Sequence, residues 1–277
     1  MNYLGLDRLL MDALEEDIGT GDITTLSCVP AGSVSRGVFR AKEDLVVCGL
    51  EVLRCTFLLV DPEVSVTFLT RDGDFVNKGD IIAEISGPSR SVLTGERTAL
   101  NLLQRLSGVA TVTARAVKAV SGTGARIADT RKTTPGLRVL EKYAVKTGGG
   151  ANHRFGLSDG VLIKDNHIVA AGGIAPAVDA VRKNAPHTLK IEVETSNLDE
   201  VEEALSAGAD IIMLDNMDYG QMAEAVLRIG GRALVEASGN MGDKDLRKVA
   251  ETGVDIISIG ALTHSPKASD ISLQFAK

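Results

Sequence analysis

The chain of 277 residues is long enough to bury one large core or two smaller ones, and its 44% hydrophobic and 24% charged residues are typical of a globular protein. A net charge of -7, together with only 3% aromatic residues, argues against nucleic acid as a partner. No apolar run reaches the roughly 18 residues that cross a bilayer, and acidic residues interrupt the N-terminal segment, so we expect no signal peptide, no membrane partner and a cytoplasmic location.

Residues 1–108 are predicted to form a mixed α/β domain. We expect an amphipathic helix over 4–16 and a second helix over 51–59. The segment 72–88 alternates apolar and polar residues around Gly-Asp turns, which is typical of a β-hairpin. It also resembles half of a biotinyl- or lipoyl-carrier domain, but no lysine follows for modification, so we interpret it as part of a structural sheet. Strand-like runs are found at 37–43, 44–49, 64–70 and 80–87.

A long helix is predicted over residues 91–120. Apolar side chains recur there at three- and four-residue steps, at Leu93, Leu100, Leu103 and Leu106. Gly108 is expected to break or kink this helix, and we place a domain boundary at that point. The second domain is then predicted to span 109–265.

Beyond residue 109 the chain repeats a unit of one short apolar run followed by a helical segment. Such repeats predict parallel strands joined by right-handed crossovers, hence an α/β barrel or a doubly wound sheet. Nearly every run ends on polar residues, as at the rim of a barrel, and no G-x-G-x-x-G follows the first run, so we favour the barrel. The runs are ARIADT, GVLIKD, LKIEVE, DIIMLD, ALVEAS and DIISIG, with helices expected near 137–147, 174–184, 198–207, 218–229 and 243–252.

Residues 129–168 form a cationic segment in an otherwise acidic chain, with seven Arg and Lys against four Asp and Glu. An excess of Arg, Lys and His among glycines suits the binding of a multiply charged anion. Arg138, Lys142 and Lys146 are spaced along a predicted helix, and we interpret them as a solvated face. The candidates for anion binding are therefore Arg131, Lys132, His153, Arg154 and Lys164.

The later strand ends carry a different chemistry. Glu194 and Asp215 follow almost wholly apolar runs and could bind a metal ion or stabilise a cationic transition state. Glu236 could equally cap the next helix, Lys164 could form a structural ion pair, and His264 could be an ordinary loop histidine. Barrels commonly bind phosphate after their last two strands, through backbone N–H groups. The small residues at these two places are Ser238, Gly239, Asn240 and Gly260.

The motif DTRKTTPGLRVLEKYAVKTGGGANHR, followed by GLSDGVLIKDNHI, resembles the signature of the quinolinate phosphoribosyltransferase family. The likeness continues through EEDIGTGDITT, TGERTALNLLQRLSGVAT, IEVET, IIMLDN, VEASGN and ISIGALTHS. It implies an N-terminal α/β sandwich, an open α/β barrel of about seven strands, and a C-terminal tail, 266–277, that returns to the first domain. It also implies an enzyme that joins quinolinate to phosphoribosyl pyrophosphate with Mg²⁺. The products would be pyrophosphate, CO₂ and nicotinate mononucleotide, in NAD biosynthesis.

On this resemblance, four cations would bind the two carboxylates of quinolinate by charge-assisted hydrogen bonds. Arg97, in TGERT, resembles the arginine that the family supplies from a neighbouring subunit, so activity would require a homodimer or a hexamer of dimers. The cationic site would also stabilise the negative charge on the ring carbon that loses CO₂, with no further cofactor. The four cations are Arg131, His153, Arg154 and Lys164.

The resemblance places phosphoribosyl pyrophosphate on the later strands. Lys132 and Lys164 would reach its sugar phosphate or its pyrophosphate. Glu194 and Asp215 would bind the ribose hydroxyls and Mg²⁺, and would stabilise an oxocarbenium-like transition state. These four residues are the predicted catalytic set. The 5′-phosphate would be held by Ser238, Gly239, Asn240, Gly260 and His264.

Other functions fit parts of the sequence. Phosphoribosyl transfer to nicotinate or another pyridine acid needs fewer cations but otherwise a similar set of site residues. A barrel aldolase or lyase could use Lys132 or Lys164 as a Schiff-base amine, although that chemistry needs a desolvated lysine. A carrier module rests on the segment 72–88 alone. The number of cations favours a dicarboxylate.

Overall fold

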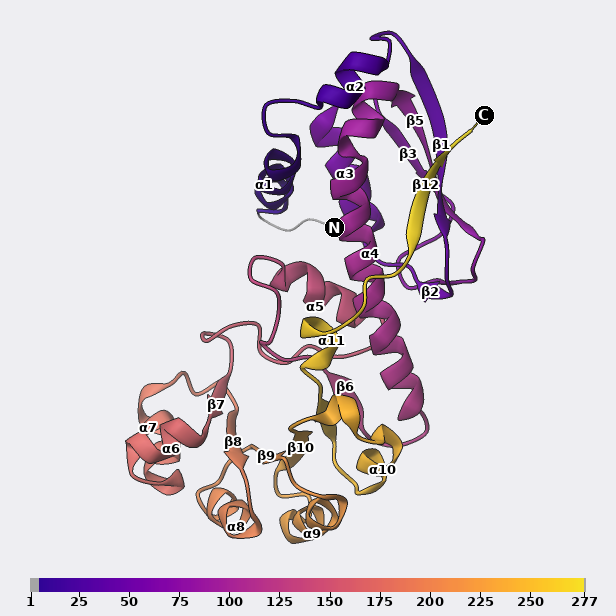
Figure 1. Cartoon of the computed structure of the whole chain (residues 1–277). Coiled ribbons are helices and arrows are strands. Elements are labelled where there is room, and N and C mark those ends of the chain that lie inside the picture. Colours follow the sequence, from indigo (N-terminus) through magenta and orange to yellow (C-terminus); the bar gives the residue numbers. More distant parts are fainter. Residues whose placement is uncertain (1–4, 277) are drawn as a thin grey trace. The chain divides into compact units, whose positions relative to one another are not determined.

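The computed structural model describes residues 5–276 and divides them into two compact units (Figure 1). The segment 139–148 is grouped with the N-terminal residues, although the predicted domains of 1–108 and 109–265 place it in the second domain. The C-terminal segment is also grouped with the N-terminal residues. The first unit comprises 5–112, 139–148 and 266–276, and the second comprises 113–138 and 149–265.

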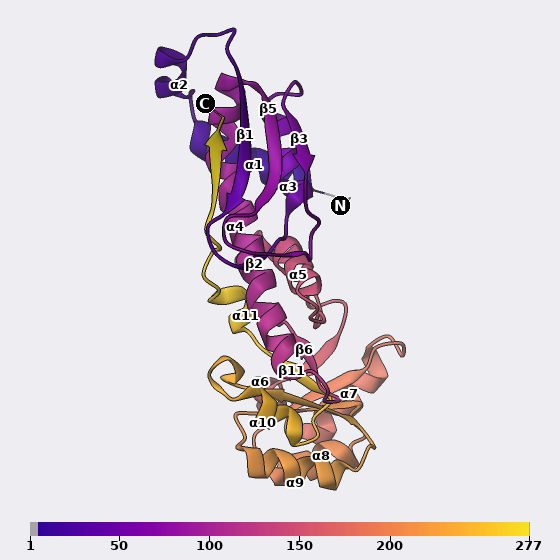
Figure 2. The ribbon, with the colours of Figure 1, turned by 90° about the vertical axis from the view of Figure 1, so that its right-hand side faces the viewer.

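The first unit is built on an antiparallel sheet that is covered by helices on one face. Helices α3 (Leu50–Val60) and α4 (Ser89–Ala119) pack on this face, as both ribbon views show (Figure 2). Phe39 and Phe57 are fully buried in the core between the sheet and these helices, and their ring centroids lie 6.1 Å apart. The strand order is β12 (Ile271–Phe275), β1 (Val34–Ala41), β5 (Ile81–Pro88) and β3 (Ser65–Phe68).

Two helices at the N-terminal end belong to the first unit as well. The helix predicted over 4–16 is α1 (Leu6–Ile18), and Leu4 lies outside the described residues. The short helix α2 (Ile23–Cys28) follows it, and the Asp22 side chain caps this helix by accepting a hydrogen bond from the Thr25 backbone N–H.

The β-hairpin predicted over 72–88 is wrong. β4 (Phe75–Val76) pairs with β2 (Leu45–Val46) in a separate two-stranded sheet, whereas β5 pairs with β1 and β3. The alternation of apolar and polar residues correctly indicated extended chain. It could not indicate the partner, because alternation specifies which face of a strand is buried and not which strand lies beside it.

Helix α4 runs unbroken past Gly108, so the predicted break is wrong. A Cβ added at Gly108 would lie 2.2 Å from the carbonyl oxygen of Lys267, so the missing side chain lets the C-terminal segment cross the helix in contact with it. The crossing is fixed by the Ser269 backbone N–H, which donates to the Gln104 carbonyl at 2.9 Å. The glycine therefore serves close packing.

Gly108→Ala is expected to lower the free energy of unfolding by about 1–3 kcal/mol, because the new methyl group overlaps a backbone oxygen that cannot move alone. Urea denaturation followed by circular dichroism measures the loss. Gly124→Ala is the matched control, since a Cβ there meets nothing within 4 Å. If the two variants were equally stable, the packing role of Gly108 would be contradicted.

Helix α5 (Arg138–Thr147) forms where a helix was predicted, but its cationic face is not solvated throughout. Lys142 is only 4% exposed, and of the three cations on this face only Lys146 is exposed. The neighbouring Glu141 is fully buried and accepts hydrogen bonds from the Arg105 guanidinium at 2.8 and 3.1 Å. Buried polar pairs of this kind hold most of α5 in the first unit.

The second unit is a parallel sheet with helices following its strands (Figure 1). The strands coincide with the six predicted runs, and the predicted α/β architecture is confirmed. About seven strands were expected, but Ala151 makes only an isolated parallel bridge to Ala128, because the glycine-rich stretch before it does not form a strand. The strand order is β6 (Arg126–Ala128), β11 (Ile256–Ser258), β10 (Leu234–Ser238), β9 (Ile211–Asp215), β8 (Ile191–Thr195) and β7 (Val161–Ile163).

Three of the helices after these strands begin at a residue whose side chain accepts a backbone N–H: Asn197, Asp218 and Asp245. No described helix is long and apolar enough to cross a membrane. The sequence missed α6, which follows directly on β7. The helices are α6 (Asp165–Ala171), α7 (Ile174–Asn184), α8 (Leu198–Ser206), α9 (Tyr219–Ile229), α10 (Leu246–Glu251) and α11 (Ala261–His264), with a short 3₁₀ turn η1 (Met241–Asp243).

Candidate active site

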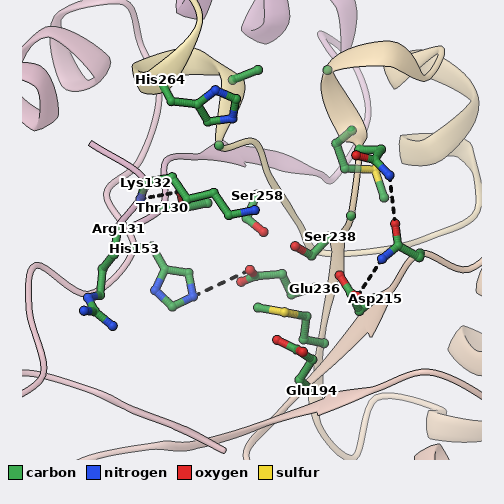
Figure 3. A pocket seen from close by; sticks show the side chains of 18 of the residues that line it. Thr130, Arg131, Lys132, His153, Glu194, Asp215, Glu236, Ser238, Ser258 and His264 are labelled. Carbon is green, nitrogen blue, oxygen red and sulfur yellow. Dashed lines mark hydrogen bonds and ion pairs between the residues drawn. The ribbon is translucent and has the colours of Figure 1, made fainter. Parts of the chain in front are cut away.

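A pocket of about 700 Å³ lies in the second unit, where the parallel strands end (Figure 3). Side chains alternate between the two faces of a strand, so the last inward-facing positions meet in this pocket. Glu194 and Ser238 reach it from β8 and β10, and Lys164 follows β7 directly. The volume is in the range of sites that enclose small organic ligands.

The cationic side of the pocket is fixed by a buried carboxylate. Asp129, which directly follows β6, is fully buried and accepts hydrogen bonds from the His153 backbone N–H at 2.8 Å and from the Asn152 amide at 2.6 Å. Arg138 donates to the Arg131 carbonyl at 3.4 Å. These bonds hold the two cationic pairs of the sequence, at 131–132 and 153–154, at one side of the pocket.

Two guanidinium groups on this side have an unusual environment. The Arg131 Nε is buried and has no hydrogen-bond partner among residues 5–276. Burial, and then the charge of Arg131, lower the pKa of Arg154, whose Nη1 donates to the Gly160 carbonyl at 3.0 Å. Two neighbouring cations in a partly dry site destabilise each other, so an anion between them is strongly favoured.

Carboxylates occupy the opposite side. Lys164 Nζ forms an ion pair with the carboxylate of Glu194, which joins the ends of β7 and β8. Asp215, at the end of β9, accepts a hydrogen bond from the Asn216 amide at 2.7 Å. Asn240 in turn donates to the Asn216 side-chain oxygen at 3.2 Å. The acids therefore lie beside one cation, facing the open pocket.

The turn after β10 comes unusually close to the turn after β9. Gly239 has a φ of 84°, and a Cβ there would lie 2.4 Å from the Asn216 Oδ1. Asn216 and Asn240 themselves have positive φ, at 56° and 51°. Backbone in this left-handed region is costly for residues other than glycine and is maintained where the surrounding structure needs it, often at a binding site.

Lys132 reaches the same end of the pocket from the other direction. A Cβ at Gly260 would meet the Lys132 side chain at 3.0 Å and the His264 ring at 3.2 Å, so both side chains pack against this glycine. The Thr263 hydroxyl donates to the Lys132 carbonyl at 2.8 Å and fixes that backbone. A lysine, a histidine and the turns after the last two strands thus form a corner whose composition suits an anion, and we call it the anion-binding corner.

Comparisons with known proteins agree with this arrangement. The model of the N-terminal domain of quinolinate phosphoribosyl transferase matches residues 22–107, and the model of its C-terminal domain matches residues 109–274. The chain belongs to the quinolinate phosphoribosyltransferase family.

Relatives of this family are similar over nearly all of this chain and most of their own length. The probable nicotinate-nucleotide pyrophosphorylase (carboxylating) of Bacillus subtilis (strain 168) is 45% identical over 273 residues, which cover 99% of this chain and 94% of the relative. The corresponding protein of Synechocystis sp. is 48% identical over 281 residues, with the same two coverages of 99% and 94%. The crystal structure of nicotinate-nucleotide pyrophosphorylase from Ehrlichia chaffeensis has a TM-score of 0.95 at 39% identity, over 99% of this chain and 100% of that one.

The pocket brings together nearly all residues that the sequence proposed for the quinolinate phosphoribosyltransferase site. Arg97 is the exception: it is exposed on α4, in the first unit, and is not among the lining residues. Lys164 forms an ion pair, as the alternative interpretation of this residue expected, but its partner is Glu194, which also lines the pocket. The proposed residues that line the pocket are Arg131, Lys132, His153, Arg154, Lys164, Glu194, Asp215, Ser238, Gly239, Asn240, Gly260 and His264.

Sequence reasoning missed an acid, Glu192, and a serine, Ser258, and left open whether Glu236 caps a helix. Glu236 is no helix cap, since it is 2% exposed inside the pocket floor and Asp245 caps α10. Period-two spacing could have found them, because Glu192 lies two residues before Glu194 and therefore faces the same side of β8. The same argument applies to Glu236 before Ser238.

Proposed function

We propose that the protein transfers the phosphoribosyl group of phosphoribosyl pyrophosphate to quinolinate and removes CO₂, giving nicotinate mononucleotide and pyrophosphate for NAD biosynthesis. The observation that carries the proposal is one pocket in which clustered cations face a pair of carboxylates, in a chain that matches the family over nearly its full length. A cytoplasmic location stays a prediction. Names of relatives include chloroplastic and mitochondrial proteins as well as bacterial ones.

The quinolinate half of the proposal rests on the cationic side of the pocket. Two adjacent carboxylates on a planar ring suit two guanidinium groups held close together, because each can donate paired N–H bonds to one carboxylate. The unpartnered Nε of Arg131 is a donor of this kind. His153, and Lys164 with its partner Glu194, also line the pocket.

The ribose half rests on Glu194 and Asp215. As C1 of the ribose loses pyrophosphate it becomes electron-poor, and carboxylates held beside it stabilise that charge. Oxygen donors of this kind also fit Mg²⁺, which commonly takes one or two protein carboxylates together with substrate phosphates. When bound there, Mg²⁺ would neutralise the charge of the departing pyrophosphate. Lys132 and Lys164 would hold the pyrophosphate from the cationic side.

The 5′-phosphate of the substrate is assigned to the anion-binding corner. The turns after β10 and β11 and the His264 side chain line the pocket there, and their backbone N–H groups and the imidazole would donate to the phosphate. Gly239 and Asn240 both have positive φ and line this part of the pocket. The set assigned to this phosphate is Ser238, Gly239, Asn240, Gly260 and His264.

The alternative lyase function is disfavoured by the state of the two lysines. Schiff-base formation needs a neutral amine, which proteins obtain by burying the lysine away from anions. Lys164 is paired with Glu194, and Lys132 is exposed, so neither lysine is buried away from anions and water. The carrier alternative loses its basis because the segment 72–88 forms no hairpin.

A direct competition of acceptors tests the proposed substrate. The protein is incubated with phosphoribosyl pyrophosphate, Mg²⁺ and equal amounts of quinolinate and nicotinate, labelled with different isotopes, and the nicotinate mononucleotide is analysed by mass. We expect the product to derive from quinolinate. Product derived from nicotinate alone would replace this proposal by the alternative of simple transfer to a pyridine monoacid.

Arg97 is proposed to act on the pocket of a neighbouring subunit in a homodimer or a hexamer of dimers. It is exposed on α4 and does not line the pocket of its own second unit, and family resemblance assigns this role to an arginine at this place. A symmetric pair would then exchange two such arginines.

Mixing two inactive variants is expected to restore activity if Arg97 works across subunits. Arg97→Ala keeps its pocket intact, and Asp215→Asn keeps its Arg97 intact. After the two are mixed and allowed to exchange subunits, half of the dimers are mixed and each has one complete site, so we expect roughly a quarter of wild-type activity. Activity no higher than that of either variant alone would contradict the exchange of arginines.

A further inference from the structure

Two buried carboxylates lie near the same nitrogen of the His153 ring, and one of them, Glu236, lines the floor of the pocket. Glu192 Oε2 is 3.1 Å and Glu236 Oε1 is 3.6 Å from His153 Nε2. Glu192 is 3% exposed and Glu236 is 2% exposed. In each of them Oε1 has no hydrogen-bond partner among the described residues. The substrate-binding roles assigned above involve neither acid, so their burial needs a separate explanation.

The His153 tautomer decides what this cluster can hold. The Arg154 backbone N–H donates to His153 Nδ1 at 2.8 Å, so Nδ1 carries the lone pair and the ring proton lies on Nε2. The three side chains are close enough to hold a metal ion, with ligand atoms within 4.8 Å of one another. A protonated Nε2 has no lone pair for a metal, so it donates to the Glu192 carboxylate. The cluster therefore suits shared protons between the His153 ring and the two carboxyl groups better than a metal ion.

Glu236 is the acid of this cluster that keeps a proton. Burial, and then the nearby charge of Glu192, raise the pKa of Glu236 to about 7, although His153, Ser258 and Lys164 act in the opposite direction. From the strands on either side, β9 contributes the apolar Met213 and β11 the neutral Ser258. Two carboxylates in a dry site around one histidine do not readily ionise together. At neutral pH and below, the pocket floor thus holds a carboxylic acid.

The place of Glu236 in the pocket matches one atom of the proposed substrate. Figure 3 shows its carboxyl group between Arg131 and His153 on one side and Asp215 and Ser238 on the other. In quinolinate, the ring carbon that loses CO₂ lies between the ring nitrogen, which bonds to the ribose, and the carbon that bears the other carboxylate. With the carboxylates at the cations and the ribose at the acids, this carbon would lie over the centre of the floor, where Glu236 lies.

We propose that Glu236 is a catalytic residue that supplies the proton that replaces CO₂ on the ring. The inference rests on the proposed function. The bond between the ring carbon and the carboxylate breaks, and its electron pair stays on the ring carbon. That pair takes the proton of the Glu236 carboxyl group, so an O–H bond breaks, a C–H bond forms, and Glu236 is left as a carboxylate. Water returns the proton before the next turnover, and no other reactant is needed.

Glu236→Gln tests the step because an amide of the same shape cannot serve as the acid. In a single turnover with quinolinate, phosphoribosyl pyrophosphate and Mg²⁺, pyrophosphate and CO₂ are measured separately. We expect pyrophosphate release within a few-fold of wild type and CO₂ release slower by about 10²–10³-fold, with quinolinate mononucleotide accumulating. Glu236→Asp, which keeps an acid, is expected to recover part of the CO₂ rate. Equal slowing of both products, or no slowing, overturns the proposal.

The pH dependence gives a readout that a merely structural role would not move. Since Glu236 holds its proton below a pKa of about 7, the wild-type rate of CO₂ release should fall as the pH rises through 7. Glu236→Gln should lose this dependence. Glu192→Gln removes the like charge beside Glu236 and should move the fall to lower pH. A pH profile that is identical in the wild type and in Glu236→Gln contradicts proton donation by Glu236.

The same variants show whether the protein is still folded and whether the proposed function itself holds. A group whose pKa is raised by folding stabilises the fold at low pH and loses that contribution as pH rises through the raised value, so at pH 8 Glu236→Gln should unfold no earlier than wild type. If wild type releases no pyrophosphate from quinolinate, the proposed function fails. If wild type is active and the two rates in Glu236→Gln stay equal, the role of Glu236 alone fails.

Discussion

Arg131→Ala is expected to abolish measurable quinolinate binding while leaving the fold intact. The side chain lines the pocket and its Nε is buried without a partner among the described residues, so the group is placed to donate to a ligand. Removing one side of a desolvated, charged hydrogen bond costs about 2–5 kcal/mol, which corresponds to a dissociation constant raised by roughly 30- to 5000-fold. Isothermal titration calorimetry with quinolinate measures this change.

The control for Arg131→Ala is Arg126→Ala, which removes the same charge from the exposed start of β6. Its quinolinate affinity should equal that of wild type, and both variants should unfold at temperatures close to the wild-type value. An unchanged affinity in Arg131→Ala would remove this residue from the site. A collapse of its thermal stability would instead indicate a structural role.

Asp215→Asn is expected to separate the two halves of the site. Quinolinate binding should change by no more than a few-fold, because Asp215 lies on the carboxylate side of the pocket. Transfer should slow by about 10²–10³-fold, since the charge that would stabilise the electron-poor ribose, and would help bind Mg²⁺, is lost. Pyrophosphate release under saturating substrates measures the transfer rate.

Asp199→Asn is the matched control, because it removes the same charge from an exposed position on α8. It should leave both quinolinate binding and transfer unchanged. If Asp215→Asn weakened quinolinate binding as strongly as transfer, the division of the pocket into a dicarboxylate side and a ribose side would be wrong.

Much of the second unit could be predicted from sequence, for a physical reason. Strands of a parallel sheet are buried on both faces and read as short apolar runs, and their carboxyl ends necessarily meet on one edge. Polar residues at those ends, such as Glu194 and Asp215, therefore predicted a common pocket before any contact was known. The structure brings these residues to one pocket.

What the sequence could not indicate was how side chains pack across distant segments. Gly108 suggested a break in the helix, because nothing near it in the chain reveals that Lys267 crosses at that point. Lys142 suggested a solvated face, because helical spacing alone does not reveal that its side chain is buried. Both errors arise where long-range contacts outweigh local propensity.

Glu236 was undervalued for a related reason. A carboxylate near the end of a strand is often a helix cap, and only the positions of His153 and Glu192 around it reveal a buried acid. His153 comes from a loop far away in the sequence, so no local pattern connects it with β10. The period-two spacing of Glu236 and Ser238 was the one available signal.

The central claim is that one pocket couples phosphoribosyl transfer to the loss of CO₂ from a dicarboxylate. The most direct measurement uses wild-type protein, phosphoribosyl pyrophosphate, Mg²⁺ and quinolinate labelled in its 2-carboxylate, and counts the CO₂ and the pyrophosphate formed over many turnovers. We predict one CO₂ for each pyrophosphate and an unlabelled nicotinate mononucleotide. Pyrophosphate without CO₂, or no reaction with quinolinate while a pyridine monoacid reacts, would contradict the account.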